Sequence, residues 1–188
     1  MTTWRHGRAQ LFERLHASAI PLTSFLDSLF RTPPQRVAGT AVFLTSARDV
    51  TPNSLLHSLK HYKVLHERNV FMTVEFRDLP WVAVEARVAC EKLEHDCWRV
   101  RVRYGFMDRP DIGAALERCG PAGLQVEPMD VTYFVSRDKV VASGEAKSPL
   151  ARWRDSVFAA MARNAGGIGD FFNIPANRLV ELGTRVEI

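Results

Sequence analysis

Apolar residues in the first 36 positions lie three or four residues apart, the spacing that places side chains on one face of a helix. This pattern predicts two short helices, one between Arg5 and His16 and one that follows Pro21. The pair Pro33–Pro34 then ends the pattern, because proline lacks the N–H that a helix needs and forces its predecessor towards extended backbone. We therefore predict a helical arm over residues 1–36 and a globular domain over residues 37–188.

From residue 37 onwards, apolar residues form short runs bounded by turn-forming residues, which is typical of β-strands. The run 37–46 is apolar almost throughout and predicts a strand that is buried on both faces. Further strands are predicted at 69–76, 82–93, 97–107, 131–136, 139–142 and 178–187. Two of the connections are short enough for hairpins, one around His95–Asp96 and one around the charged segment 136–139.

Three helices are predicted between these strands. Thr51 as the N-cap and Pro52 as the first helical residue open a helix that runs to about Tyr62. A short helix is predicted over 114–119, and a longer one begins at Ser148–Pro149 and ends at the glycine pair 166–167. Strands that alternate with helices indicate an α/β fold, a mixed sheet with flanking helices, in one globular domain preceded by the short helical arm.

Composition narrows the class of protein. The chain has 188 residues, of which 46% are hydrophobic and 24% are charged, and these are ordinary values for a compact protein. No run approaches the roughly 20 apolar residues of a membrane-spanning helix. The amino terminus lacks the apolar segment of a secretory signal. We therefore expect a chain that does not cross a membrane by itself and is not exported.

The charge and the cysteine content argue against a nucleic-acid-binding protein, a disulfide-rich protein and a zinc protein. The net charge of +4 and the pI of about 9.2 are mild, and the basic residues are dispersed, so nucleic acid is not an expected partner. Cys90, Cys97 and Cys119 are odd in number and far apart, unlike a disulfide framework or a zinc site. We interpret them as reduced, buried thiols.

The densest group of hydrogen-bond donors lies between residues 60 and 68, where the predicted helix ends and a strand begins. Such edges of open α/β sheets are where ligands bind, and lysine and arginine offer charge-assisted hydrogen bonds to phosphates or carboxylates. A solvated turn, with Glu67 neutralising a neighbour, is the alternative. The candidate ligand-binding residues are Lys60, His61, Lys63, His66, Arg68 and, next to the glycine-rich segment 164–170, Arg163.

Other motifs in the sequence are weaker indications of a functional site. His57 and His61 have the spacing of a helical metal pair, but no HExxH signature accompanies them and basic neighbours would repel a cation, so no metal is expected. The glycine-rich segment 164–170 fits neither a dinucleotide-binding nor a P-loop pattern. Residues 103–106 resemble only part of an RNA-recognition strand, and Gly105 there makes room for a neighbour. No nucleophile motif is present, so we expect neither an enzyme nor a cofactor.

Several segments of the chain are similar to the C-terminal end of the Kup family of bacterial potassium uptake transporters. They extend over nearly the whole chain and are TWRHGR at 3–8, GTAVFLT at 39–45, HSLKHYKVLHER at 57–68, YGFM at 104–107 and FFNIPANRLVELGTRVEI at 171–188. The segment 136–139 is more charged than that family's pattern. The resemblance implies the soluble cytosolic tail of a K⁺/H⁺ symporter, in which residues 1–36 form a membrane-proximal arm on the cytoplasmic side. An excess of arginine in that arm agrees with the positive-inside rule.

The resemblance leaves three hypotheses for the function. The transmembrane core of the same transporter would be the partner, and the domain would regulate transport or brace a homodimer. Alternatively, it is a sensor that binds cyclic di-AMP or ATP through the 60–68 residues and Arg163, with Tyr62 available to stack on a base. The third hypothesis is a free-standing cytoplasmic enzyme or RNA-binding protein.

Overall fold

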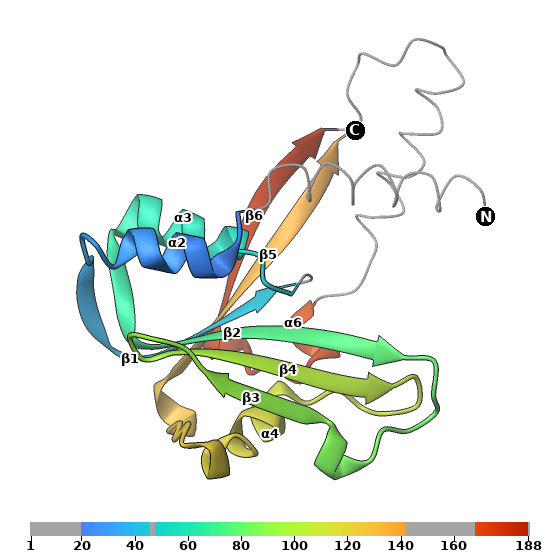
Figure 1. Cartoon of the computed structure of the whole chain (residues 1–188). Helices are drawn as coiled ribbons and strands as arrows, with labels where there is room; N and C mark the ends of the chain where they lie inside the picture. The colour runs from blue at the N-terminus through green and yellow to red at the C-terminus, as the bar shows by residue number, and fades with distance from the viewer. Residues whose placement is uncertain (1–19, 46–47, 142–167, 188) are drawn as a thin grey trace, which may run out of the picture. The chain divides into compact units, whose positions relative to one another are not determined.

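A computed structural model describes residues 20–45, 48–141 and 168–187 and places them around one six-stranded sheet (Figure 1). The strand order is β3-β4-β2-β1-β5-β6. The strands are β1 (Gln35–Thr45), β2 (Val64–Arg77), β3 (Val88–Lys92), β4 (Cys97–Gly105), β5 (Val131–Val141) and β6 (Leu179–Glu187). The helices are α2 (Leu22–Leu29), α3 (Asn53–Tyr62), α4 (Ile112–Glu117) and α6 (Ile168–Phe171).

The sheet is mixed. Strand β1 pairs in parallel with β2 and β5, β2 pairs in parallel with β4, and β3 is antiparallel to β4 at the edge. The predicted α/β fold with a mixed sheet is therefore confirmed. The chain divides into two compact units, and the larger one comprises Pro21–Ser136 and Gly167–Leu182. All the sites described below lie in this larger unit.

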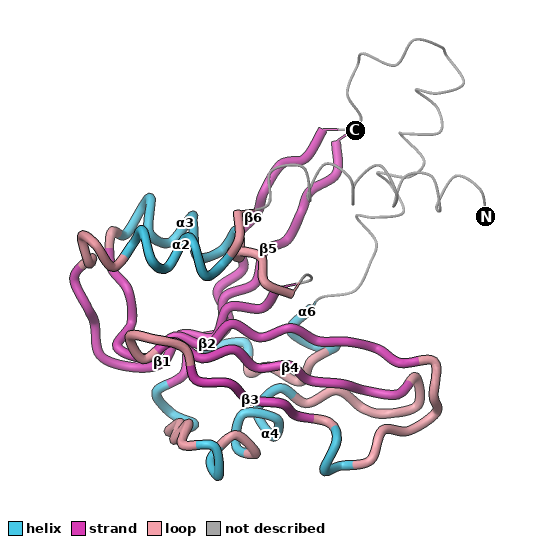
Figure 2. The backbone as a smooth tube through the Cα atoms, in the orientation of Figure 1, coloured by secondary structure: helices cyan, strands magenta, loops and turns pink. Residues whose placement is uncertain are grey.

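Helices cover both faces of the sheet (Figure 2). Helices α2 and α3 lie side by side on one face, over a cluster of buried residues that includes Leu22, Phe43, Leu55 and Phe71. Helix α4 lies on the opposite face, over a second cluster that includes Val42, Val100 and Trp98. Because Val42 and Phe43 are adjacent in β1 and belong to different clusters, the prediction of a strand buried on both faces is confirmed.

The amino-terminal part of the larger unit matches its apolar pattern. Helix α2 follows Pro21 as predicted, and Leu22 and Leu26 on its stripe are buried. The helix packs into the core although it falls within the predicted arm, and the boundary between arm and domain stays a prediction. The predicted helix between Arg5 and His16 lies outside the described residues.

Helix α3 forms where it was predicted, but its predicted cap is wrong. Pro52 occupies the N-cap position and its carbonyl accepts from the N–H of Leu55 at 3.0 Å. The Thr51 hydroxyl lies one residue too early to cap, and it is buried with no hydrogen-bond partner among the described residues. A proline at this position supplies the extended backbone that an N-cap residue adopts, so the helix begins without a side-chain cap.

Strand β2 begins earlier than predicted. It starts at Val64, directly after Lys63, whose left-handed backbone at φ 58° ends α3. Parallel pairing with β1 begins at once, since Val64 lies opposite Gln35. His66 and Arg68 are therefore strand residues, and the turn before them is a single residue long.

The first predicted hairpin is confirmed and the second is wrong. His95 and Asp96 have positive φ angles of 57° and 54°, as a tight turn between β3 and β4 requires. By contrast, β5 continues unbroken from Val131 to Val141. The segment 136–139 holds no glycine or asparagine for a two-residue turn, and the neighbours of β5 are the distant strands β1 and β6.

Helix α4, strand β3 and strand β6 each have a counterpart among the predicted elements. Helix α4 begins after Asp111, whose carboxylate accepts from the N–H of Ala114 at 2.9 Å. The predicted strand 82–93 is shorter, because its first part is the 3₁₀ helix Val84–Ala86. The last strand is confirmed as β6. The helix predicted from Ser148 lies outside the described residues.

Candidate functional site

An open pocket of about 760 Å³ lies at the amino-terminal ends of the parallel strands β1, β2, β4 and β5. We call it the amino-end pocket. Its lining residues are Arg36, Gly39, Glu67, Arg68, Asp96, Gln125, Val126, Glu127 and Asp130. Ligands of open α/β sheets usually bind at the carboxyl ends of the strands, so this pocket lies at the opposite end from the one that the fold rule favours.

Arg36 holds the beginnings of three strands together. Its guanidinium donates to the carbonyls of His66 and Glu67 at 2.9 Å each, and to the carbonyl of His95 at 3.0 Å. The same group lies over the ring of Phe30, 5.1 Å from its centroid, and Phe30 in turn stacks on His95. Most of the N–H donors of Arg36 are therefore already bonded to backbone carbonyls of the protein.

Arg68 makes a similar link on another wall of the pocket. Its guanidinium donates to the carbonyl of Gln125 at 2.6 Å and lies 3.5 Å from the hydroxyl of Thr40. These contacts tie β2 to β1 and to the segment that leads into β5. Arg68 retains further N–H donors, because two contacts do not use all five.

Acidic side chains outnumber the two arginines in the amino-end pocket. Glu67, Asp96, Glu127 and Asp130 line the pocket together with Arg36 and Arg68, which gives the lining a formal charge of −2. Lys92 lies 3.9 Å from Asp96 in an exposed ion pair. This balance favours cationic or hydrogen-bonding groups over a free phosphate.

Gly39 shapes the wall between β1 and Asp130. Its φ angle of 103° is one that side chains rarely adopt, and a Cβ atom there would lie 2.9 Å from the carboxylate of Asp130. The pairing between β1 and β2 shifts register between Val37 and Thr40, at this same glycine. The glycine thus allows Asp130 to approach the strand closely.

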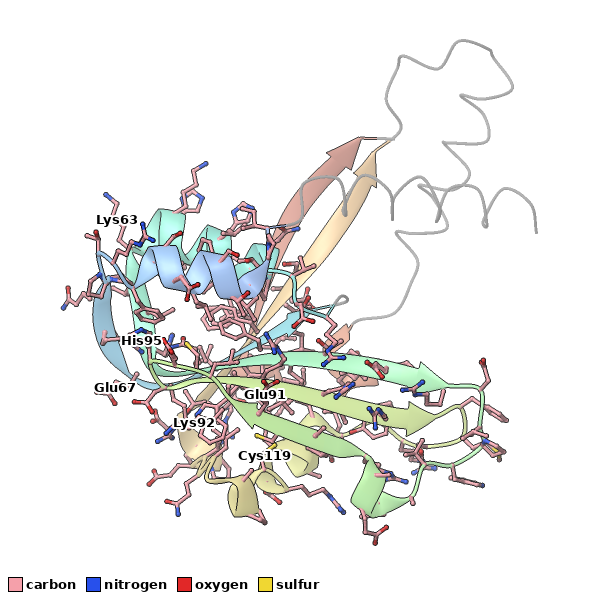
Figure 3. The ribbon with its side chains drawn as sticks, viewed as in Figure 1. Lys63, Glu67, Glu91, Lys92, His95 and Cys119 are labelled. Carbon is pink, nitrogen blue, oxygen red and sulfur yellow. The ribbon has the colours of Figure 1, made fainter. Side chains whose placement is uncertain are left out.

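Among the described candidate residues, only Arg68 lines the amino-end pocket. Lys60, His61 and Lys63 are exposed at the carboxyl end of α3, whereas Arg68 lines the amino-end pocket. Figure 3 shows Lys63 beside the helices and Glu67 at the start of β2. Arg163 lies outside the described residues. Ligand binding by these residues stays a prediction.

His66 is half-buried in β2 and packs its ring against Phe134, with the centroids 5.8 Å apart. Burial lowers the pKa of His66 below its ordinary value, and the negative charge of Asp130 opposes that shift only in part. The neutral imidazole is therefore favoured in the folded protein.

Sequence reasoning missed Arg36 and the acidic wall formed by residues 125–130. No local pattern marks them, because Arg36 meets its carbonyl partners across 30 or more positions of the chain.

The rings of His57 and His61 stack, with centroids 5.8 Å apart. Within the described residues, no three metal-ligating side chains come together.

The described part of the chain also lacks any helix with the length and apolar character needed to cross a bilayer. Comparison with known proteins gives a match to the family model of the K⁺ potassium transporter C-terminal domain over residues 38–188. No solved structure matches the chain.

Named relatives agree with the family model. The probable potassium transport system protein Kup 2 of Cupriavidus necator is 51% identical over 189 residues, which covers 100% of this chain and 30% of the relative. The probable potassium transport system protein Kup of Nitrosospira multiformis is 50% identical over 188 residues, which covers 100% of this chain and 29% of the relative. The chain thus spans about 30% of the length of these curated relatives. As the resemblance predicted, the chain belongs to the family of potassium transporter C-terminal domains.

Proposed function

We propose that this chain serves as the cytosolic C-terminal domain of a Kup-like potassium transporter of the K⁺/H⁺ symport type that the resemblance implies, and that it regulates or braces the transmembrane core of the same protein. The observation that carries the proposal is the alignment of the whole chain, at about half identity, with the terminal 30% of proteins named for potassium transport. In this role the domain moves no ion itself and catalyses no reaction. Its partner is the remainder of the transporter.

A bracing role needs a surface that holds a partner. Large apolar side chains lie exposed just beyond the carboxyl ends of β2 and β4, with exposed fractions of 58% for Leu79, 60% for Trp81, 65% for Phe106 and 54% for Met107. Clusters of this kind commonly mark protein–protein contacts. We propose this surface as the contact that joins two copies of the domain or one copy to the transmembrane core.

The test replaces the matching C-terminal segment of the Cupriavidus necator relative with this chain. Cells that lack potassium uptake should grow on limiting potassium when they carry the chimera. A matched chimera with Trp81→Ser and Phe106→Ser should show reduced uptake at equal membrane abundance. The control is Tyr62→Ser, which removes an aromatic that is 61% exposed on α3. If the chimera supports no uptake while the unaltered relative does, the proposal is wrong.

Nucleotide sensing is the second candidate function. The amino-end pocket has room for a nucleotide, and Arg36 and Arg68 line it. The four carboxylates of the lining oppose a free phosphate, so a nucleotide would need Arg68 to turn its remaining donors towards it. Under this hypothesis the domain would change transport by binding a ligand more tightly in one conformation of the transporter.

Calorimetry of the purified chain with cyclic di-AMP, ATP and ADP separates the two candidates. Binding at the amino-end pocket should disappear in Arg68→Gln and persist in Lys60→Ala, since Lys60 lies exposed at the end of α3. Binding lost only in Lys60→Ala would move the site to the helix end. No heat with any of the three ligands would remove the sensing hypothesis and leave the bracing role.

A further inference from the structure

Two of the three cysteines meet on the face of the sheet that carries α4. Cys119 follows α4 and is 1% exposed within the cluster under that helix. Cys90 lies on the edge strand β3, is partly exposed, and packs against the same cluster. Strand β3 also contacts the 3₁₀ helix Gly120–Ala122, which begins directly after Cys119. Figure 3 shows Cys119 below β3 on the α4 side.

The two thiols have unequal affinities for a proton. The neighbouring Cys119 thiol lowers the pKa of Cys90, against the opposing effect of burial. The neighbouring Cys90 thiol raises the pKa of Cys119, and burial adds to that rise. The S–H group of Cys119 donates to the carbonyl of Ala115, 3.6 Å away. The more accessible thiol is thus the better nucleophile, and the buried one holds a proton beside it.

We propose that Cys90 and Cys119 form a redox-active pair that small hydroperoxides convert to an intramolecular disulfide. In the first step the Cys90 thiolate attacks a peroxide oxygen, an S–O bond forms and the O–O bond breaks, leaving a sulfenic acid on Cys90 and releasing an alkoxide or hydroxide. The leaving oxygen takes up a proton and departs as alcohol or water.

In the second step the Cys119 sulfur attacks the Cys90 sulfur. An S–S bond forms, the S–O bond breaks, and the hydroxide that leaves takes the proton of Cys119 to give water. Two thiols have then lost two electrons and two protons, and the peroxide has gained them. A dithiol reductant reverses the change by thiol–disulfide exchange.

The disulfide would covalently join the edge strand β3 to the segment that ends α4. These two elements are in contact at this face of the sheet. Oxidation would therefore restrict the separation of β3 from the α4 segment without adding any group to the surface.

Cys97 provides a matched control within the same chain. It is 0% exposed and belongs to the cluster on the opposite face, under α2 and α3. Burial raises the pKa of Cys97 to about 12, so almost none of it is thiolate at neutral pH. Since the chain has three cysteines in all, one disulfide between Cys90 and Cys119 leaves Cys97 as the remaining thiol.

The experiment treats the reduced, purified chain with hydrogen peroxide and maps the products by mass spectrometry without reduction. We expect a Cys90–Cys119 cross-link, about 2 Da lighter than the two thiols, and an unmodified Cys97. The rate should not depend on protein concentration. Cys97→Ser should react as the unaltered chain does, and Cys90→Ser should form no disulfide.

Cys119→Ser distinguishes the order of the steps and keeps the test valid if one variant folds poorly. In that variant Cys90 should stop at the sulfenic acid, which dimedone traps, while circular dichroism reports whether the fold is kept. Three outcomes would overturn the proposal: no oxidation of Cys90, a disulfide between two chains only, or a cross-link that includes Cys97.

Discussion

At the scale of single residues, Gly105 shows how closely two backbone segments approach in this fold. A Cβ atom at Gly105 would lie 2.3 Å from the carbonyl oxygen of Pro80 and 2.6 Å from that of Leu79. Those carbonyls accept from the N–H groups of Phe106 and Met107. The expectation from sequence that Gly105 makes room for a neighbour is therefore confirmed.

Gly105→Ala should destabilise the protein by roughly 2–3 kcal/mol, because the clash is with backbone that cannot move without breaking its hydrogen bonds. Chemical denaturation followed by circular dichroism measures the change. Gly120→Ala is the control, since no atom of the described part of the chain lies within 4 Å of a Cβ there. Equal stability of the two variants would show that the loop gives way at little cost.

The half-buried His66 predicts a pH dependence of stability. Burial lowers the pKa of His66 in the folded protein. As the pH falls, the unfolded chain, whose histidine pKa is about 6.5, therefore binds a proton at a higher pH than the folded protein does. The contribution of His66 is fully present above that pH and is lost as the pH falls towards the folded pKa. His66→Gln should flatten the decline in free energy of unfolding just below pH ~6.5. Parallel curves for both proteins would contradict this assignment.

At the scale of secondary structure, caps and turns decide where the elements begin. Helix α4 has a side-chain cap: one carboxylate oxygen of Asp111 accepts from Ala114, and the other accepts from the amide of Asn173 at 2.9 Å. Helix α3 has none, since proline occupies its N-cap. The short helix α4 thus depends more on its cap than the longer α3 does.

Asp111→Ala should lower the free energy of unfolding by about 1 kcal/mol, the usual effect of removing an N-cap. Asp111→Asn keeps an oxygen acceptor for Ala114 and should recover most of the loss. Urea denaturation of the three proteins tests this. A variant with asparagine that is as unstable as the one with alanine would indicate that the charge, and not the cap, matters at this position.

At the scale of the whole molecule, the amino-end pocket exists because separate strands are tied together at one edge of the sheet. Arg36 contacts the beginnings of β2 and β4 through three carbonyls, and Arg68 joins β2 to the segment before β5. The two arginines therefore act first as parts of the fold. Any ligand in the pocket would share these groups with the backbone.

Arg36→Ala should destabilise the protein by about 2 kcal/mol, because it removes charge-assisted hydrogen bonds to partly exposed carbonyls. Arg36→Lys is the informative comparison. A lysine keeps the charge, but it lacks the planar fork that reaches several carbonyls at once, so it should restore less than half of the loss. Thermal unfolding of both variants measures the difference, and full recovery with lysine would mean that charge alone is sufficient.

The family, the α/β class and most strands followed from sequence alone, since apolar spacing and turn residues such as His95–Asp96 are local signals. The sequence predicted a hairpin at 136–139 because charged residues are common in turns. In the structure, β5 runs through this segment without a turn and lies between β1 and β6 in the sheet. The sequence grouped Lys60, His61 and Lys63 with Arg68, but Arg68 lines the amino-end pocket while the other three are exposed at the carboxyl end of α3.

Only the tertiary structure brought Arg36 to the carbonyls of His66 and His95, and Cys90 and Cys119 to the same apolar cluster. The reason is physical: local patterns report which face of an element is apolar, and burial then determines which elements pack together. Which side chains meet across the chain depends on strand order and register, and these are decided by the packing of the complete sheet.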